Sequence, residues 1–465
     1  MINGIKKQYD HRTVWVRIFT IFLGLWLIVA PGTFGYTCII MTRSDIITGI
    51  IIVLFGLADL IRPRVSIKWI LFFIGMYLNL APVLFWAPDA ASYLNDTVVG
   101  NLLIGLAILV PGAEDMLLPR SQEIPPGWSY NPSSWLQRAP VVVFGVFGWF
   151  VARYLGACQL GYIDIHSVWD PFFGTDSTYH VIASDLSKSF PFADGALGAF
   201  AYNLEALLGL KGGTARWRTM PWLVVGFGIL VIPLGFCSII LVMCQPIIVG
   251  YWCGLCLTMA FCMLVMIAFT VDEVVAVIDF LGNCRRKGHS LWTVFWHGHI
   301  SEDSKTDTRT PHFNAPLNKS LSAVAWGVSI PWNLLLTALA GAWLMLSPDC
   351  LHAAGETVQK IGALLGLTSS GGMVLLRPLM AADAAHVLGA LFVVISVISW
   401  GEVVRPLRFV NILLALILLA SLWLIPERSP MHYWNDMIVG IVVILFSFRR
   451  GRILERYGHW HCKIF

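Results

Sequence analysis

Two cysteines, Cys253 and Cys256, form a CxxC at the start of a long apolar run that reaches Thr270. At this spacing both sulfur atoms lie on one face of a helix, and the positive end of the helix dipole favours a thiolate there. A redox pair at a membrane surface suggests electron exchange between protein thiols outside the membrane and a lipid-soluble carrier within it. The sequence therefore predicts a redox centre with Cys253 and Cys256 as catalytic residues.

The elements that position this pair are predicted to be membrane spans. The chain of 465 residues is 57% hydrophobic and 12% charged, and soluble domains carry about twice that charged fraction. Apolar residues come in blocks long enough to cross about 30 Å of hydrocarbon, without the alternation of a membrane barrel. We predict an all-α polytopic membrane protein with about 12 transmembrane helices. The expected spans are 17–36, 45–61, 67–86, 97–112, 141–163, 194–210, 221–244, 251–275, 322–346, 381–400, 408–425 and 435–448.

Basic residues indicate how these spans are oriented. With the N-terminus in the cytoplasm, about 25 of the 31 Lys and Arg fall on the inner side, as the positive-inside rule requires. Both termini are then expected to be cytoplasmic, with the CxxC at the outer face. The net charge of +4 gives no indication of nucleic-acid binding. The first apolar segment lacks a small-residue cleavage pattern, so a retained span is expected rather than a signal peptide.

The two ends of the chain resemble each other. Each end is predicted to hold four spans in the same orientation, and the central spans 141–275 have no counterpart. An Asn-Asp pair stands where the chain re-enters the membrane in each half; we expect it to cap the following helix, with a polar site between the halves as the alternative. Matching positions are Gly24 and Gly341, Trp26 and Trp343, Gly49 and Gly389, and Asn95-Asp96 and Asn435-Asp436.

The run from Ser429 to Asp436, Ser-Pro-Met-His-Tyr-Trp-Asn-Asp, resembles the signature of the SPW repeat family. The first copy keeps Asn95-Asp96 but has Leu94 in place of the tryptophan. The resemblance implies two-helix membrane hairpins. We therefore expect SPW-repeat-like membrane halves at 1–120 and 319–465, with a cytoplasmic linker at 283–318 preceding the second.

The central unit resembles the vitamin K epoxide reductase family. It has four spans with a long outer loop after the first, and Val181-Ile-Ala-Ser184 is followed by Pro191 and Gly198. The third span ends just before a short outer turn, and Cys253-Gly-Leu-Cys256 opens the fourth. We expect this domain at 121–282, with its spans at about 141–275.

The resemblance implies a membrane thiol–disulfide oxidoreductase linked to a quinone of the ubiquinone or menaquinone type. Cys253 would exchange disulfides with incoming thiols, and Cys256 would pass electrons to quinone held in an apolar pocket of the bundle. The implied partners are the lipid bilayer, the quinone, and a thiol or thioredoxin-like protein on the outer face. The implied location is the bacterial inner (plasma) membrane.

Two positions depart from the family pattern. The family carries two shuttle cysteines in the outer loop, one of them three residues before the valine of the Val-x-x-Ser segment. That position is Thr178 here, and residues 164–198 contain no cysteine. Either substrates reach Cys253 directly, or Cys158 or Cys244 acts as an accessory thiol. The second departure is Ala260, where vitamin K reductases carry a tyrosine that contacts the quinone.

Other polar and aromatic residues of the central unit have predicted roles. Ser184, Trp169 and Phe172 are expected to support an outer loop that caps the quinone mouth, with an ordinary interfacial loop as the alternative. The His and carboxylate spacings match no ligand pattern, so no metal is predicted. Arg153 and Glu205 fall at similar depth and are predicted to pair, either to fix helix register or to serve as a proton path.

Three functions remain open at this point. The first is a thiol–quinone oxidoreductase that works without the usual shuttle cysteines. The second is a non-catalytic membrane module for redox sensing or scaffolding, which the missing loop cysteines favour. The third is a transporter formed by the SPW halves, although the predicted spans there carry almost no ionisable residue near their middle.

Overall fold

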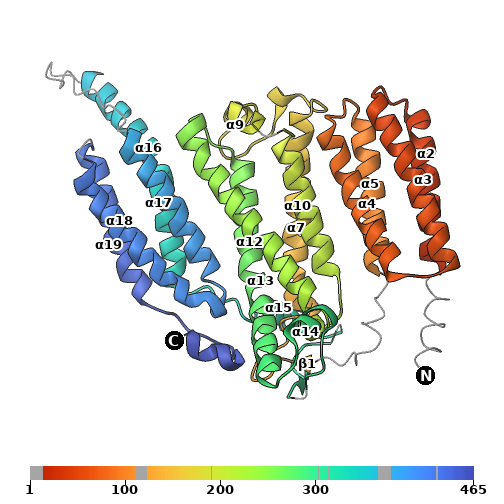
Figure 1. Cartoon of the computed structure of the whole chain (residues 1–465). Helices are drawn as coiled ribbons and strands as arrows, with labels where there is room; N and C mark the ends of the chain where they lie inside the picture. Colours follow the sequence, from red (N-terminus) through yellow and green to blue (C-terminus); the bar gives the residue numbers. More distant parts are fainter. Residues whose placement is uncertain are drawn as a thin grey trace.

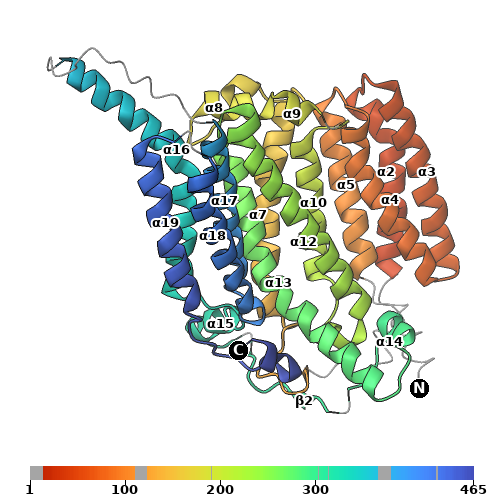
Figure 2. The same cartoon turned by 60° about the vertical axis from the view of Figure 1, so that its left-hand side comes forward.

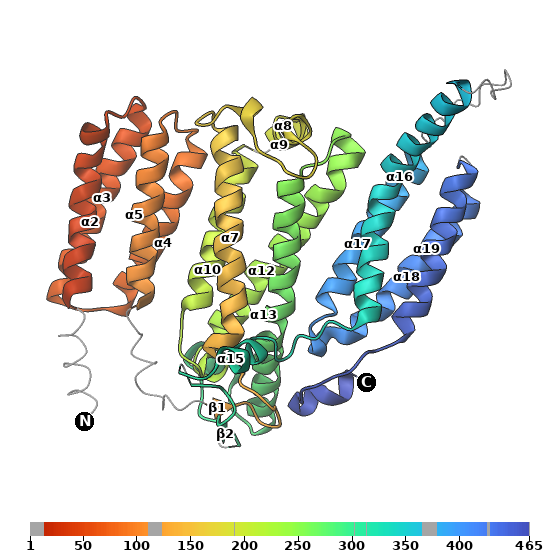
Figure 3. The same ribbon diagram turned by 180° about the vertical axis from the view of Figure 1, so that it is seen from behind.

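The protein is a bundle of membrane-spanning helices arranged in three neighbouring groups (Figure 1). The structure is a computed structural model that describes residues 14–109, 123–189, 191–301, 303–312, 314–364, 379–425 and 428–464. Figure 3 shows the groups in chain order from the opposite side, with the central group between the other two. This arrangement confirms the predicted all-α polytopic membrane architecture.

The N-terminal group contains four helices that run up and down. They form because long apolar runs satisfy their backbone hydrogen bonds internally, which hydrocarbon requires. Helices α2 and α3 approach closely where Gly24 faces Gly49, since a Cβ added at Gly24 would lie 2.8 Å from the Gly49 carbonyl oxygen. The helices are α2 (Val14–Phe34), α3 (Ile39–Ile61), α4 (Val65–Leu84) and α5 (Ala90–Leu109).

The central group contains four long helices and several short elements. The Ser134 hydroxyl caps α7 by accepting the N–H of Gln137 at 3.4 Å. The π-turn η2 ends at Gly250, whose φ of 78° suits glycine. The elements are β1 (Glu123–Ile124), α7 (Trp135–Gln159), η1 (Ile165–Ser167), α8 (Thr175–Ile182), α9 (Asp185–Lys188), α10 (Asp194–Leu210), α11 (Arg216–Thr219), α12 (Pro221–Cys244), η2 (Gln245–Val249) and α13 (Gly254–Arg286).

The C-terminal group begins after a segment that pairs β2 with β1 in an antiparallel ribbon. Helix α19 is capped by Ser429, whose hydroxyl accepts the N–H of His432 at 3.3 Å. The remaining elements are α14 (Leu291–His297), β2 (Lys305–Thr306), α15 (Leu317–Val324), α16 (Trp332–Leu364), α17 (Leu379–Ile398), η3 (Glu402–Leu407), α18 (Arg408–Leu424), α19 (Pro430–Phe448) and η4 (Gly458–Lys463).

Ten of the described helices are long and apolar enough to cross a membrane. The other two predicted spans correspond to α5 and to α10, which has 17 residues, and both stand beside the ten in Figure 2. The end of the fourth predicted span, 110–112, lies outside the described residues. The domain boundaries given above stay predictions.

The two repeat halves make the same contacts at positions that match in sequence. Gly341 faces Gly389 as Gly24 faces Gly49, and a Cβ at Gly341 would lie 2.8 Å from the Gly389 carbonyl oxygen. In the N-terminal half the indole N–H of Trp26 donates to Asn95 Oδ1 at 2.9 Å. In the C-terminal half Trp343 donates to Asn435 Oδ1 at 2.8 Å.

The expectation that the Asn-Asp pairs cap helices is wrong. Helix α5 begins at Ala90, so Asn95 and Asp96 lie inside it. Likewise α19 begins at Pro430, with Ser429 as its cap rather than Asn435 or Asp436. Both helices start earlier than hydropathy suggests, because each begins with a more polar first turn. The Asn-Asp pairs therefore lie inside the helices, within the bundle.

The two ends of the bundle differ. We call the end with α8, α9 and the loop that leads into α13 the CxxC face, and the end with β1, α14, α15 and the C-terminus the tail face (Figures 1 and 2). Helix α2 starts at the tail face, and α16 extends past the neighbouring helices on the CxxC face. The predicted topology makes the tail face cytoplasmic.

A buried polar network closes the tail face of the central group. Arg216 pairs with Glu273 through two hydrogen bonds, 2.7 Å from Nε to Oε1 and 2.5 Å from Nη2 to Oε2. Tyr130 donates to Asp272 Oδ2 at 2.5 Å. The preceding 123–134 segment and α11 cover these carboxylates, so Asp272 and Glu273 are buried in the half of α13 that is nearer the tail face.

The groups are packed against one another. The central and C-terminal groups share one apolar core that includes Val271, Ala338, Trp400 and Tyr457. The N-terminal group meets α10 through Asn203, whose side-chain Nδ2 donates to Asn101 Oδ1 at 2.5 Å. This packing holds the central group, which carries the CxxC, between the two repeats.

Candidate functional site: a capped CxxC above a cavity

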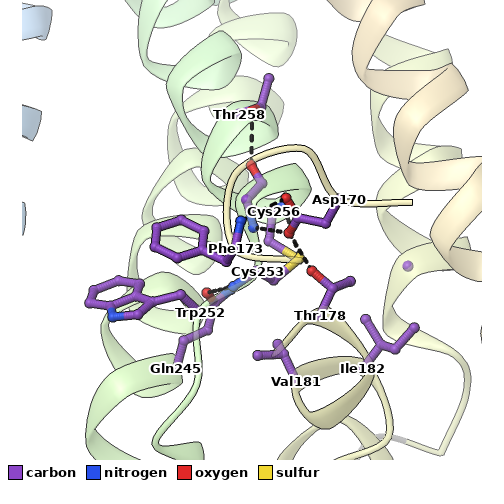
Figure 4. The surroundings of a disulfide bond; sticks show 12 residues. Asp170, Phe173, Thr178, Val181, Ile182, Gln245, Trp252, Cys253, Cys256 and Thr258 are labelled. Atoms are coloured by element: carbon purple, nitrogen blue, oxygen red, sulfur yellow. Dashed lines mark hydrogen bonds between the residues drawn. A yellow bond between two sulfur atoms is a disulfide. The ribbon is translucent and has the colours of Figure 1, made fainter. Parts of the chain in front are cut away.

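Cys253 and Cys256 are joined by a disulfide at the first turn of α13 (Figure 4). Cys253 is the N-cap of the helix, and its sulfur accepts the backbone N–H of Cys256 at 3.1 Å. The Cys253 N–H in turn donates to Gln245 Oε1 at 3.0 Å, which ties the turn to the end of α12. A thiolate formed at Cys253 would therefore meet an amide donor and the positive end of the helix dipole.

Asp170 in the outer loop fastens this loop to the CxxC turn. Its Oδ2 accepts the Gly254 N–H at 2.7 Å, and the Thr178 hydroxyl donates to the same oxygen. Its Oδ1 accepts the N–H groups of Phe172 at 2.8 Å and Phe173 at 3.2 Å. Burial opposes the charged form, but these four hydrogen bonds together lower the pKa of the Asp170 carboxyl below its ordinary value.

Gly254 is the residue that permits this close approach. A Cβ added there would lie 2.6 Å from Asp170 Oδ1 and 2.8 Å from the Phe172 ring. Ser177 adds a second connection, because its hydroxyl donates to the Trp252 carbonyl oxygen at 2.6 Å. We call residues 165–189 the cap. Cys253 lies beneath it with 0% of its surface exposed.

A cavity lies on the inner side of the disulfide. Its empty volume, with the open mouth included, is about 810 Å³. It is bounded by α7, α10, α12 and α13 and by the cap, and Cys256, Met259 and Ala260 line its α13 wall. Cys253 does not line it, so the two cysteines have different surroundings.

One wall of this cavity is polar. The Gln159 side-chain Nε2 donates to Ser187 Oγ at 2.8 Å and to Asp194, and Gln159 Oε1 accepts the Gly195 N–H at 2.9 Å. The rest of the lining is largely apolar, and Tyr202 points its hydroxyl to the Met259 carbonyl oxygen at 2.8 Å. A mostly apolar cavity with a few fixed polar groups is typical of small-molecule sites.

The structure places the remaining predicted residues of the cap as follows. Ser184 caps α9, since its hydroxyl accepts the N–H of Ser187 at 3.2 Å, and it lines the cavity. Trp169 and Phe172 project outward with 67% and 68% of their surface exposed. They are therefore at the surface of the cap rather than in the cavity.

The two accessory thiols lie near the site but are not bonded to it. Cys158 is buried in the same apolar cluster as Cys253, at the end of α7. Cys244 is half-buried at the end of α12, next to Gln245. Both are free thiols while Cys253 and Cys256 form a disulfide.

The predicted pair of Arg153 and Glu205 does not form. The Arg153 guanidinium lies over the Tyr93 ring, 4.6 Å from its centroid, and so faces the N-terminal group. Glu205 is fully buried, and neither of its carboxylate oxygens has a hydrogen-bond partner among the described residues. Equal depth on two helices does not determine the direction of either side chain, and here Arg153 turns to the Tyr93 ring instead of to Glu205.

Several residues of the site were not predicted. Asp170 carries a recognisable signal, because an Asp followed by Pro171 and then by residues whose N–H groups it accepts is a turn motif. Gln159 and Gln245 carry no such signal, since single amides at helix ends are common. Trp252 is tied to the C-terminal group, because its indole N–H donates to Asp349 Oδ2 at 2.9 Å.

No group of three His, Cys, Asp or Glu side chains among the described residues is arranged to hold a metal ion. Comparison with protein families gives two matches. Residues 139–271 match the vitamin K epoxide reductase family, and residues 14–110 match the SPW repeat domain. No curated protein and no solved structure matches the chain. The chain is thus a polytopic membrane protein in which an SPW repeat domain precedes a domain of the vitamin K epoxide reductase family, a family of membrane thiol–disulfide oxidoreductases.

Proposed function

We propose that this protein is a membrane thiol–quinone oxidoreductase in which Cys253 and Cys256 pass electrons between outer-face thiols and a quinone in the cavity. The observation that carries the proposal is the different exposure of the two sulfur-bearing residues. Cys256 lines the cavity, whereas Cys253 lies under the cap at the CxxC face. In this proposal Cys256 meets the lipid-soluble ligand, and Cys253 meets the thiol when the cap opens.

The chemistry balances over two half-reactions. Two partner thiols reduce the Cys253–Cys256 disulfide, and a disulfide forms on the partner while two thiols form here. The dithiol then gives two electrons and two protons to a quinone, which becomes a quinol, and the disulfide is restored. The closed disulfide described above is the form that awaits thiols.

Direct access of the thiol to Cys253 requires the cap to open, because the closed cap covers this residue completely. Residues 164–198 contain no cysteine, and Thr178 uses its hydroxyl to bond Asp170. A relay through loop cysteines is therefore replaced by opening of the cap. A thioredoxin-like protein or another thiol on the outer face of a bacterial inner membrane would be the partner, and the quinone would be of the ubiquinone or menaquinone type.

The test uses the full chain in nanodiscs. After anaerobic reduction, short-chain ubiquinone or menaquinone is added, and the redox state of each cysteine is read by differential alkylation and mass spectrometry. We expect quinone to oxidise Cys253 and Cys256, and either Cys253→Ser or Cys256→Ser to abolish quinol formation. Cys244→Ser and Cys158→Ser serve as matched controls that keep the activity.

A non-catalytic redox-sensing or scaffolding module is the second candidate, and the bonds of Asp170 that close the cap favour it. In that case the pair stays reduced when quinone is supplied, in the wild type as in the variants. A pair that is indifferent to both quinones would overturn the oxidoreductase proposal.

A further inference from the structure

The N-terminal repeat contains a buried polar cluster that the CxxC chemistry does not use. Asp45 on α3 and Asp96 on α5 each have 0% of their surface exposed. Each lies six residues from the start of its helix, about 9 Å below the helix end on the CxxC face. Tyr36, in the turn after α2, and Asn95 stand next to them.

The members of this cluster interact with one another and with little else. The Asp45 carboxyl faces Asp96 and Tyr36, and Asn95 faces Asp96. Among the described residues, these are the only charged or titratable groups and the only amide that act on the pair. None of the four carboxylate oxygens, nor Tyr36 Oη, nor the Asn95 Nδ2, makes a regular hydrogen bond to a described residue.

The charge of this cluster is not balanced by the described residues. Two ionised carboxylates would place two negative charges together in a region of low dielectric, which is strongly unfavourable without a cation. Such pairs either share a proton or bind a positive ion. Asn95 does not remove the problem, because its Oδ1 accepts from Trp26 and its Nδ2 brings no charge.

At the matching position of the C-terminal repeat, the carboxylate is neutralised by an arginine. Asp436, which matches Asp96, pairs with Arg428, and the other guanidinium nitrogen donates to Ser421 Oγ at 2.8 Å. Ala385 stands in α17 where the alignment of Gly49 with Gly389 places the counterpart of Asp45. One repeat thus has one carboxylate and a built-in cation, and the other has two carboxylates.

We propose that Asp45 and Asp96, with Tyr36 above them, form a binding site for one small monovalent cation, either a sodium ion or a proton. The cation takes the place that the Arg428 guanidinium holds in the C-terminal repeat. The site is independent of Cys253 and Cys256, so its test and that of the proposed function do not share an outcome. It also supplies a buried ionisable pair that a cation-coupled transporter would need.

The experiment measures the Tm of the purified full chain in nanodiscs. Sodium chloride replaces choline chloride stepwise at constant ionic strength and pH 8, and a second series varies pH without sodium. If sodium binds, the Tm rises saturably with sodium. If the site holds a proton, the Tm falls as pH rises, because deprotonation leaves two facing charges. Asp45→Asn and Asp96→Asn should each abolish the response.

Asp436→Asn is the matched control, because it leaves Arg428 unpaired in the other repeat. It should lower the Tm but keep the wild-type response to sodium and pH. Two further measurements compare the wild type with Asp45→Asn/Asp96→Asn: binding of radioactive sodium, and the difference in the infrared carbonyl band of protonated carboxylic acids, since Glu205 contributes to that band in both proteins. Absence of both, or equal responses in the wild type and in Asp45→Asn/Asp96→Asn, would overturn the proposal.

Discussion

Asp170 and Gly254 are joined by a hydrogen bond of 2.7 Å that fixes the cap to the first turn of the CxxC helix. Thr178, at the position where the family resemblance expects a shuttle cysteine, donates to the same carboxylate. A hydrogen-bond donor to Asp170 thus stands where the resemblance expects a relay cysteine, and we call Asp170 with its bonds to Thr178 and Gly254 the clamp. In the proposed function, reduction of the disulfide by an external thiol depends on how often this clamp opens.

Weakening the clamp should expose Cys253. Thr178→Ala removes one hydrogen bond, about 1 kcal/mol, which is about a fivefold increase in the open fraction of the cap. Asp170→Asn removes a charge-assisted acceptor and should increase opening about tenfold or more. The measurement is the rate at which a maleimide labels Cys253 in the reduced protein.

Asp176→Asn provides the control for this series, because the Asp176 side chain lies on the same cap with 88% of its surface exposed. Its labelling rate should equal that of the wild type. Equal rates in Thr178→Ala and the wild type would show that the clamp does not limit access.

The clamp should also respond to acid. The pKa of Asp170 is lower in the closed cap than in an open loop, so the ionised carboxylate stabilises the closed cap at pH values above about 4. This stabilisation of the closed cap is lost as the pH falls below the lowered pKa of Asp170, because the carboxyl group then becomes protonated. We expect pepsin to cleave between Phe172 and Phe173 increasingly below that range, after correction with an unfolded reference substrate. In the Asp170→Asn variant, the corrected rate of cleavage between Phe172 and Phe173 should not change over this pH range.

Filling the cavity should separate quinone reduction from thiol chemistry. Ala260→Leu places three additional carbons on the α13 wall of the cavity. Quinol formation should fall at least tenfold, because the ligand loses its place beside Cys256, whereas oxidation of the pair by the soluble oxidant diamide should continue. Equal loss of both reactions would mean that the substitution disturbs the CxxC itself.

The buried ion pair of Arg216 and Glu273 at the tail face should contribute strongly to the free energy of unfolding. Breaking a buried pair by removal of one partner costs about 3–5 kcal/mol, because the other charge is left unpaired. Glu273→Gln and Arg216→Met should therefore each lower the unfolding free energy by about this amount. The double variant Arg216→Met/Glu273→Leu should be less destabilised than either single one, as measured by SDS titration of the purified protein. Additive losses would contradict this account.

The sequence predicts those features that depend on neighbouring residues or on periodic patterns along the chain. Apolar length predicted the helices, and CxxC spacing placed both cysteines at the start of one of them. The matched glycines of the repeats were also readable, because close helix approach at Gly24 and Gly49 needs a residue without a side chain. In the sequence Thr178 stands out as a departure from the family pattern, but its role as a donor to Asp170 follows only from the structure.

Contacts between elements could not be predicted in the same way. Depth along the membrane suggested Arg153 and Glu205 as a pair, but rotation about the helix axes turns Arg153 to the Tyr93 ring. Glu273 is likewise buried because Arg216, from a short helix with no hydropathy signal, covers it. Such partners depend on tertiary packing, which periodicity does not encode.

The hydrogen bond from Trp252 to Asp349 ties the CxxC turn to the C-terminal repeat, in addition to the cap that covers the turn. Trp252 directly precedes Cys253, and its ring also lies 5.7 Å from the ring of His386 in α17. Any adjustment of the CxxC turn when the disulfide opens must therefore be absorbed by the C-terminal repeat or must break this anchor. In the proposed function, electron transfer at Cys253 and Cys256 therefore depends on correct assembly of the C-terminal repeat against the CxxC turn.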